Sequence, residues 1–230
     1  MQILPVLNYF FIIHFIWRKY KILYYNIFMN CYFFGTFNPV HLGHIEIARQ
    51  VKNLLNFDKI IFVPAYIPPH KIEGIWSYSD RLNMLKLAVG EENVSDIESK
   101  LKIPSYTYRT IEKLYEENGQ NRVNFILGYD QFFKLESWKE PEILRQKIHF
   151  IVIPRRFRNG QTLAKGAFDY FKNKGYSFDV LNINFLDISS SMIRNLIENN
   201  HDITGLVTKE VKNYIEEHRL YKKLVKGKSV

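Results

Sequence analysis

Apolar residues fall into two alternating patterns along this chain. Short runs that are almost wholly apolar, as expected for strands buried on both faces of a sheet, are separated by longer segments in which apolar residues recur every three or four positions, as on one face of a helix. The short runs predict strands at residues 31–34, 59–63, 123–127, 148–153 and 178–185, with a weaker strand near residues 93–97.

The helical pattern predicts helices between and after these strands. They are expected at residues 41–55, 79–89 with Ser79 as N-cap, 106–118, 190–198 and 208–217. Such alternation is typical of an α/β fold with a Rossmann-like, doubly wound parallel sheet, here followed by a small C-terminal helical subdomain. Ligands of these sheets bind at the carboxyl ends of the strands, so the loops that follow the strands are where functional residues are expected.

The first 28 residues differ from the rest of the chain. They contain no Asp or Glu and carry their basic residues after a long apolar stretch, which is the reverse of the order in a signal peptide. A membrane span is a marginal alternative, because the uncharged stretch is at the short limit for crossing a bilayer and includes Pro, Asn and His. We expect residues 1–28 to be an extension outside the native fold with Met29 as the natural start, one domain over residues 29–221, and a basic tail at residues 222–230.

Composition and charge narrow the class of protein. The chain has 230 residues, of which 47% are hydrophobic and 24% charged, which is the amino-acid composition of an ordinary globular protein. Its only cysteine, Cys31, has no partner for an intrachain disulfide, so the cytoplasm is the expected compartment. The net charge of +9 suits a protein that meets phosphate groups. Basic and acidic residues are mixed, without a basic run interleaved with aromatic residues, so we expect neither nucleic-acid binding nor stable membrane association.

The most informative segment is GTFNPVHLGH at residues 35–44, between the first strand and the first helix. Its first glycine allows a sharp turn close to a ligand, while Asn38 and Pro39 suit a helix cap and a first helical residue. His41 and His44 would then lie on one face of the first turns. Free amide groups and the positive end of the helix dipole favour an anion at that place, and two imidazoles would add donors to it.

A second segment, ISSSMIR at residues 188–194, supports the first from the far end of the chain. Ser189 or Ser190 can cap a helix, and Ser190 and Arg194 are spaced four apart so that they share a face. The forked guanidinium of Arg194 can donate to two phosphate oxygens at once. The segment therefore predicts a second phosphate-binding helix start.

The two segments resemble the HxGH and ISSTxIR motifs of the nucleotidyltransferase superfamily. Every fixed position of the wider form GxFxPxHxGH is filled, and Ser191 stands where Thr is usual in the second motif. The resemblance implies transfer of a nucleotide group from ATP, with His41, His44 and Arg194 as catalytic residues. The ATP-binding residues that it implies are Gly35, Thr36, Phe37, His41, His44, Gly128, Asp130, Ser189, Ser190, Ser191 and Arg194.

Other segments resemble bacterial nicotinate-nucleotide adenylyltransferases, over residues 29 to about 221. They are PPHK at 68–71, SYT at 105–107, GYD at 128–130 with Trp138 beyond it, and the ending at residues 211–221. The resemblance implies nicotinate mononucleotide as the acceptor, preferred in its carboxylate form, and nicotinate adenine dinucleotide and pyrophosphate as products of this step of NAD biosynthesis. It places Lys71, Thr107 and Trp138 at the acceptor, where an aromatic face suits a pyridinium ring.

Three positions depart from the family pattern. Phe34 replaces the first Gly of the usual GGTF, Asn38 replaces the usual Asp, and Arg109 stands where Asp commonly follows SYT. Asn38 can still cap a helix, whereas Arg109 reverses a charge near the expected acceptor site.

Neither motif has a cluster of carboxylates beside it, so we expect no metal site of the protein's own and Mg²⁺ carried by the ATP phosphates. The expected partners are ATP and nicotinate mononucleotide, and a homo-oligomer is left open. Three other classes stay open: another transferase of the superfamily, such as one acting on phosphopantetheine, a nucleotide-binding regulator without catalysis, and a basic nucleic-acid-binding module.

Overall fold

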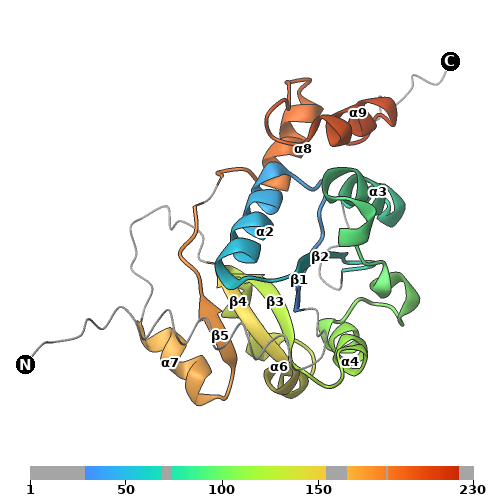
Figure 1. The fold of residues 1–230 in the computed structure, drawn as a ribbon. Helices are drawn as coiled ribbons and strands as arrows, with labels where there is room; N and C mark the ends of the chain where they lie inside the picture. Colours follow the sequence, from blue (N-terminus) through green and yellow to red (C-terminus); the bar gives the residue numbers. More distant parts are fainter. Residues whose placement is uncertain (1–28, 69–73, 154–164, 185, 223–230) are drawn as a thin grey trace, which may run out of the picture.

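The computed structural model describes residues 29–68, 74–153, 165–184 and 186–222, so the predictions for residues 1–28 and for Lys71 lie outside the described residues. A five-stranded parallel sheet has the strand order β2-β1-β3-β4-β5 (Figure 1), which confirms the predicted fold class. The strands are β1 (Asn30–Gly35), β2 (Lys59–Pro64), β3 (Val123–Gly128), β4 (Ile148–Ile153) and β5 (Ser177–Val180).

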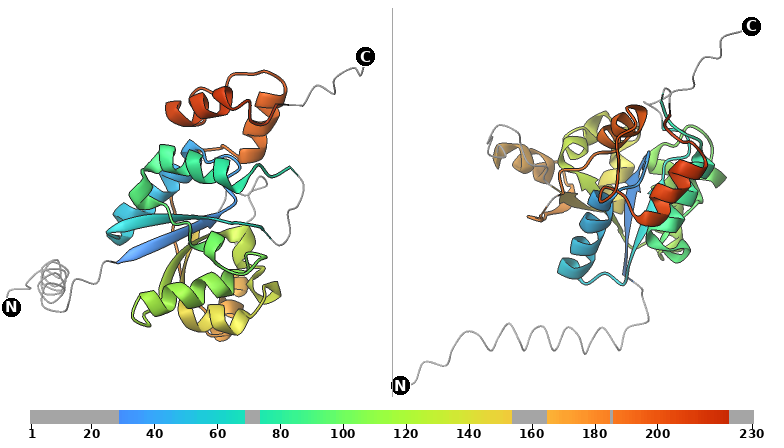
Figure 2. Two further views of the ribbon diagram at one scale, coloured as in Figure 1. Left: turned by 90° about the vertical axis from the view of Figure 1, so that its right-hand side faces the viewer. Right: turned by 90° about the horizontal axis from the view of Figure 1, so that it is seen from above.

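Helices surround the sheet in the views of Figure 2. The α-helices are α2 (Leu42–Leu55), α3 (Tyr78–Val89), α4 (Thr107–Glu117), α5 (Tyr129–Phe132), α6 (Pro141–Lys147), α7 (Lys165–Asn173), α8 (Ser190–Glu198) and α9 (Lys209–Glu217). Short 3₁₀ helices are η1 (Glu91–Asn93), η2 (Ile97–Lys100) and η3 (Leu135–Ser137). The described residues include no helix with the length and apolar character needed to cross a membrane.

Two hydrophobic cores explain why the strand sequences are almost wholly apolar. Successive side chains of a strand point to opposite faces of the sheet. Ile126 of β3 belongs to the core that contains Val51 of α2, whereas Phe125 beside it belongs to the core that contains Leu114 of α4 and Leu144 of α6. An inner strand such as β3 must therefore supply apolar residues to both faces, which removes the alternation of an exposed strand.

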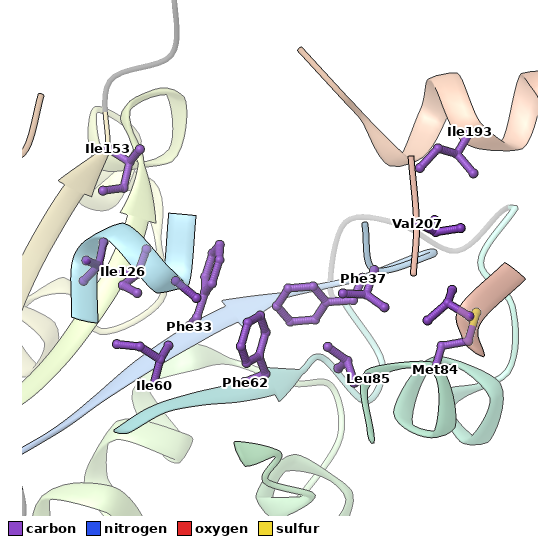
Figure 3. Close-up of a cluster of buried hydrophobic side chains, with 14 of the residues drawn as sticks. Phe33, Phe37, Ile60, Phe62, Met84, Leu85, Ile126, Ile153, Ile193 and Val207 are labelled. Carbon is purple, nitrogen blue, oxygen red and sulfur yellow. The ribbon is translucent and has the colours of Figure 1, made fainter. Parts of the chain in front are cut away.

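The first core continues past the carboxyl ends of β1 and β2. Phe37, which follows β1, packs edge-on against Phe33 with ring centroids 5.7 Å apart and lies 5.6 Å from the ring of Phe62. Figure 3 shows Phe37 between these two rings and the side chains of Val207 and Met84. The loop that leaves β1 is thus fixed by apolar packing as well as by hydrogen bonds.

The strand order creates a switch point between β1 and β3. From β1 the chain proceeds to β2 on one side, and β3 then pairs with β1 on the other side. The register pairs Phe33 with Ile126, so Gly35 and Gly128 end their strands at the same level of the sheet. Ligands of open α/β sheets bind at such a point, because the loops leave it in opposite directions.

Some predicted elements are wrong. Residues 93–97 form no strand, since η1 and η2 occupy this region and only Val94 makes a single bridge to Phe62. Ser77, not Ser79, caps α3, because the Ser77 side chain accepts a hydrogen bond from the backbone N–H of Asp80. The last strand ends at Val180, well before residue 185.

Candidate active site

The loop from β1 to α2 does not begin the helix where the sequence indicates. Asn38 and Pro39 precede the helix instead of starting it, and α2 begins at Leu42 with His41 in extended geometry as its N-cap. The prediction that Asn38 caps the helix is therefore wrong, because its side chain has partners in other segments. The backbone N–H of Leu42 is also not available to a ligand, since it donates to the carbonyl of Leu206 at 2.9 Å.

His41 and His44 lie against each other at the start of α2. Their rings are stacked with centroids 3.7 Å apart, and the backbone N–H of His41 donates to Nδ1 of His44 at 3.3 Å. Because Nδ1 of His44 accepts this bond, a neutral imidazole carries its hydrogen on Nε2. A Cβ at Gly43 would be 3.0 Å from Nδ1 of His41, so glycine leaves room for the stacked pair.

Aromatic residues fix the half-buried ring of His44 from other sides. Phe37 meets it edge-on at 5.0 Å and Phe33 at 5.9 Å. Phe37 has a positive φ of 48°, and a Cβ at Gly35 would lie 2.9 Å from its ring. The glycine at the end of β1 therefore makes room for the ring that packs on His44.

The second motif touches the first. Ser189 caps α8, since its hydroxyl accepts from the backbone N–H of Met192 at 3.2 Å. The Ser190 hydroxyl donates to the carbonyl of Pro39 at 2.9 Å, and Nη1 of Arg194 donates to the carbonyl of Asn38 at 2.8 Å. The predicted spacing of Ser190 and Arg194 on one helix face is confirmed, and both residues hold the loop that leads to His44.

The Asn38 side chain is a junction that the sequence did not reveal. Its Nδ2 donates to the carbonyl of Gly74 at 2.9 Å, while its Oδ1 accepts from the backbone N–H of Trp76 at 3.3 Å and from the hydroxyl of Tyr221 at 3.0 Å. Burial raises the pKa of the Tyr221 phenol, so the hydroxyl stays protonated as a donor at neutral pH. An Asp at position 38 could accept the latter two bonds, but it could not donate to Gly74.

Arg81 of α3 is a second residue that the sequence did not reveal. It is 1% exposed, and its guanidinium donates to the carbonyls of Thr36 at 2.9 Å, Tyr66 at 3.1 Å and Trp76 at 3.1 Å. Burial lowers its pKa, although an Arg guanidinium stays charged in proteins. An Arg on an amphipathic helix is usually exposed to solvent, so no pattern in the sequence indicated this role.

Gly128 and Asp130 lie on the other side of the switch point. Gly128 precedes α5, and a Cβ placed on it would meet no atom within 4 Å, so space is open beside it. Asp130, in the first turn of α5, is exposed. The structure thus brings the GYD segment to the same edge of the sheet as Gly35.

Thr107 and Trp138, the described residues among those expected at the acceptor, lie on neighbouring segments. Thr107 is the first residue of α4 and is half-buried, as is Trp138, which packs against the second core. The ammonium group of Lys139 lies 5.2 Å from the ring centroid of Tyr106, which brings the Trp138 segment next to the start of α4. Arg109 has local partners: it donates to the carbonyl of Lys102 at 2.9 Å and to other groups nearby.

The donors at the two helix starts suit an anion better than a metal ion. They are imidazole, hydroxyl and guanidinium groups, which donate hydrogen bonds to phosphate oxygens. In the described part of the chain, no three His, Cys, Asp or Glu side chains are grouped as metal ligands.

The chain is similar to known proteins over most of its length. The sequence profile of the cytidylyltransferase-like family matches residues 32–196. A probable nicotinate-nucleotide adenylyltransferase of Caldicellulosiruptor saccharolyticus is 38% identical over 194 residues, which are 83% of this chain and 97% of the relative. One of Clostridium tetani is 37% identical over 197 residues, again 83% of this chain and 97% of the relative.

A solved structure shares the fold. The Plasmodium falciparum nicotinic acid mononucleotide adenylyltransferase complexed with NaAD superposes with a TM-score of 0.68 at 22% identity, covering 84% of this chain and 96% of that protein. This likeness shows the fold, and the family is shown by the sequence profile and by relatives that match over nearly their whole length. The chain belongs to the cytidylyltransferase-like family and, within it, to the nicotinate-nucleotide adenylyltransferases.

Proposed function

We propose that the chain transfers the AMP group of ATP to nicotinate mononucleotide, giving nicotinate adenine dinucleotide and pyrophosphate. The observation that carries the proposal is the contact of Ser190 and Arg194 with the loop before His44, because it brings both motif segments to one place. The relatives that match 97% of their own length are named for this activity, a step of NAD biosynthesis.

The acceptor supplies its own nucleophile. A phosphate oxygen of nicotinate mononucleotide attacks the α-phosphorus of ATP in line, and a new P–O bond forms between the two phosphates. The bond from the α-phosphorus to the oxygen that bridges to the β-phosphate breaks, and pyrophosphate leaves with the bonding electron pair. The protein then needs neither a Ser or Cys nucleophile nor a general base, because positioning and charge stabilisation suffice.

His44 stabilises the charge that accumulates on the α-phosphate. Its Nε2–H is the donor for a phosphate oxygen, since the His41 backbone N–H occupies Nδ1. His41 keeps the ring in its plane by stacking on it. Arg194 uses Nη1 on the Asn38 carbonyl, and its other N–H groups are the donors for the β- and γ-phosphates.

The remaining ATP contacts come from both sides of the switch point. The three serines that open α8 lie beside the departing pyrophosphate, and the GYD segment after β3 faces the nucleoside. The acceptor ring is held at the start of α4. The proposed ATP-binding residues besides the two histidines and Arg194 are Gly35, Thr36, Phe37, Gly128, Asp130, Ser189, Ser190 and Ser191, and the proposed acceptor residues are Lys71, Thr107 and Trp138.

Mg²⁺ is part of the same proposal. Bound to the ATP phosphates, it neutralises part of their charge and makes pyrophosphate a better leaving group. His44, Arg194 and the α8 serines hold the phosphate oxygens that remain. We place the protein in the cytoplasm, with small-molecule substrates as its partners.

The test is release of pyrophosphate from ATP with separate acceptors. Nicotinate mononucleotide, its carboxamide counterpart and phosphopantetheine are supplied one at a time, each with Mg²⁺ and with EDTA. The proposal expects turnover with nicotinate mononucleotide that EDTA abolishes, and formation of the dinucleotide. Turnover with phosphopantetheine alone would assign the chain a different acceptor, and release without any acceptor would indicate hydrolysis.

A further inference from the structure

A buried carboxylate lies near the site but outside both motifs. Glu98, in η2, is 4% exposed. Its Oε2 accepts from the backbone N–H of Tyr66 at 3.1 Å, its Oε1 accepts from the hydroxyl of Thr110 at 3.1 Å, and the Ser105 hydroxyl donates to it as well. The two carboxylate oxygens of Glu98 therefore accept hydrogen bonds from the loop after β2 and from the segment that opens α4.

The peptide groups of Tyr66 connect Glu98 with Arg81. The N–H of Tyr66 donates to Glu98, and its carbonyl accepts from Nη2 of Arg81. Arg81 also donates to the carbonyl of Thr36 in the loop that leads to His44. Arg81 thus reaches the loops after both β1 and β2, whereas the hydrogen bonds that Glu98 accepts come from the loop after β2 and from the region of α4.

The loop after β2 and the start of α4 are also paired directly. The backbone N–H of Ile67 donates to the Ser105 hydroxyl at 3.0 Å, and the backbone N–H of Ser105 donates to the carbonyl of Ile67 at 3.0 Å. Thr107, two residues after Ser105, begins α4. Any shift of the loop at Ile67 is therefore transmitted to the helix start that carries Thr107.

Burial of the Glu98 carboxylate is unfavourable for the stability of the fold. Burial raises the pKa of its carboxyl group, while its hydrogen-bond donors and the nearby Arg81 charge act in the opposite direction. Apolar residues would fill the same volume without loss of hydration. They would not accept the N–H of Tyr66 or the hydroxyl of Thr110, so what the carboxylate provides is the fixed position of these two segments.

We propose that Glu98 is a positioning residue that sets the acceptor side of the site independently of the ATP side. It acts through Tyr66, Ser105 and Thr110 on the segment that carries Thr107. The inference rests on the proposed function for the identity of the acceptor. It concerns a residue that contacts neither substrate.

Kinetics with both substrates test the proposal. Thr110→Val removes one donor to Glu98 at nearly constant volume, and Glu98→Leu removes the acceptor. Both are expected to raise the KM for nicotinate mononucleotide about tenfold and to change the KM for ATP less than about twofold. Glu98→Gln keeps an oxygen for the Tyr66 N–H and is expected to restore most of the acceptor affinity.

Ile111→Val is the matched control. Ile111 is the neighbour of Thr110 on α4 and is fully buried in the second core, so the change lowers stability without touching Glu98. Both KM values of this variant should equal those of the wild type. If Glu98→Leu does not fold, Thr110→Val decides the outcome. Equal increases in both KM values, or an unchanged KM for the acceptor, would overturn the proposal.

Backbone hydrogen exchange gives a readout that does not require turnover. Thr110→Val is expected to speed exchange at the amides of Tyr66 and Ile67 and to leave the amides of residues 36–41 unchanged. If the wild type shows no turnover with nicotinate mononucleotide, the proposed function fails, whereas exchange still decides whether Glu98 holds the loop. Unchanged exchange at Tyr66 would overturn the positioning role even in a fully active enzyme.

Discussion

The guanidinium of Arg194 donates to the main-chain carbonyl of Asn38 across 2.8 Å, joining residues that are 156 positions apart in the chain. Nη2 of the same guanidinium donates to the hydroxyl of Ser191 at 3.5 Å, and the five N–H groups of an Arg side chain exceed these two bonds. Arg194 therefore has a structural partner and donors for a ligand at the same time. Substitution of Arg194 should therefore change both the stability of the fold and the kinetics with ATP.

His44→Ala is expected to lower kcat by about 10² to 10³, which is typical for loss of one preorganised donor at developing charge. Binding of ATP should weaken much less, because the charge on the α-phosphate grows in the transition state. Steady-state kinetics and ATP titration measure the two effects. His201→Ala, which changes an exposed histidine, is the control, and near-normal kcat in a folded His44→Ala protein would refute the assigned role.

Arg194→Ala, unlike His44→Ala, should change the KM for ATP as well as kcat. A contact with the β- and γ-phosphates exists already in the ground state, so the KM for ATP is expected to rise while kcat falls. The loss of the bond to Asn38 should also lower the free energy of unfolding by about 1–3 kcal/mol, as measured by urea denaturation. Arg194→Lys keeps a charge but not the fork, so it should recover only part of the ATP affinity. A lower kcat with an unchanged KM for ATP would argue against the pyrophosphate contact.

Tyr221→Phe removes only the hydroxyl that donates to Asn38. The free energy of unfolding should fall by about 0.5–1.5 kcal/mol, and kcat should fall severalfold because the loop before His44 loses one of its restraints. Asn38→Asp keeps the acceptor oxygens and loses the donor to Gly74, so it tests the other side of the same junction. Activity identical to the wild type in both variants would show that this junction does not influence the site.

Trp138→Ala is expected to raise the KM for nicotinate mononucleotide about tenfold with little effect on the KM for ATP, since stacking on a charged ring contributes about 1–2 kcal/mol. The carboxylate acceptor should be used in preference to the carboxamide in the wild type. Trp138→Phe keeps an aromatic face and is the control. Equal turnover of the two acceptors would contradict the preference inferred from the family.

Stability should decline in alkaline solution. Burial raises the pKa of Tyr78 from 10.0 to about 12 and also raises that of Tyr221. The unfolded chain releases these protons from about pH 10, whereas the folded protein retains them, so the free energy of unfolding falls as pH rises above about 10. Tyr78→Phe should flatten the decline between pH 10 and 12 in urea denaturation. Tyr170→Phe, at an exposed position, should not.

A chain of residues 29–230 should be as active as the full chain. The backbone N–H of Met29 donates to the Asp58 carboxylate at 2.6 Å, and the N–H of Asp58 donates to the carbonyl of Met29. Met29 is therefore hydrogen-bonded to the segment before β2. Thermal unfolding and pyrophosphate release measured on both chains provide the comparison. Misfolding of the shorter chain alone would mean that residues 1–28 contribute to the structure.

The sequence predicted the fold well because burial on both faces of the sheet leaves a clear local signal. The apolar run 148–153 coincides with β4, and Thr208, at the predicted start of the final helix, is the N-cap of α9. The sequence interpretation named no helix at α5, α6 or α7, which have 4, 7 and 9 residues. The predicted strand at 93–97 is wrong, because Val94 makes only an isolated bridge to Phe62 of β2 and no ladder of hydrogen bonds extends from it.

The sequence indicated the motif residues of the candidate site, but it did not indicate most of the contacts that hold them. Adjacent motif positions place His41 and His44 together, since their spacing is local. Asn38 appeared to be a helix cap because its local context allowed that role, and only tertiary contacts show its bonds to Gly74 and Tyr221. Arg81 gave no signal, because burial of its charge depends on three carbonyls from the two loops that follow β1 and β2, which lie apart from each other in the sequence.

The junction at Asn38 has a consequence for synthesis of the protein. Its partners Arg194 and Tyr221 are added 156 and 183 residues later, so a ribosome must add Tyr221 before the loop can acquire its final restraints. Domains otherwise fold from the N-terminus while translation proceeds. The strands of the sheet can pair earlier, whereas a nascent chain that has not reached Tyr221 lacks contacts that hold the loop before His44, so this loop acquires its final restraints after the sheet.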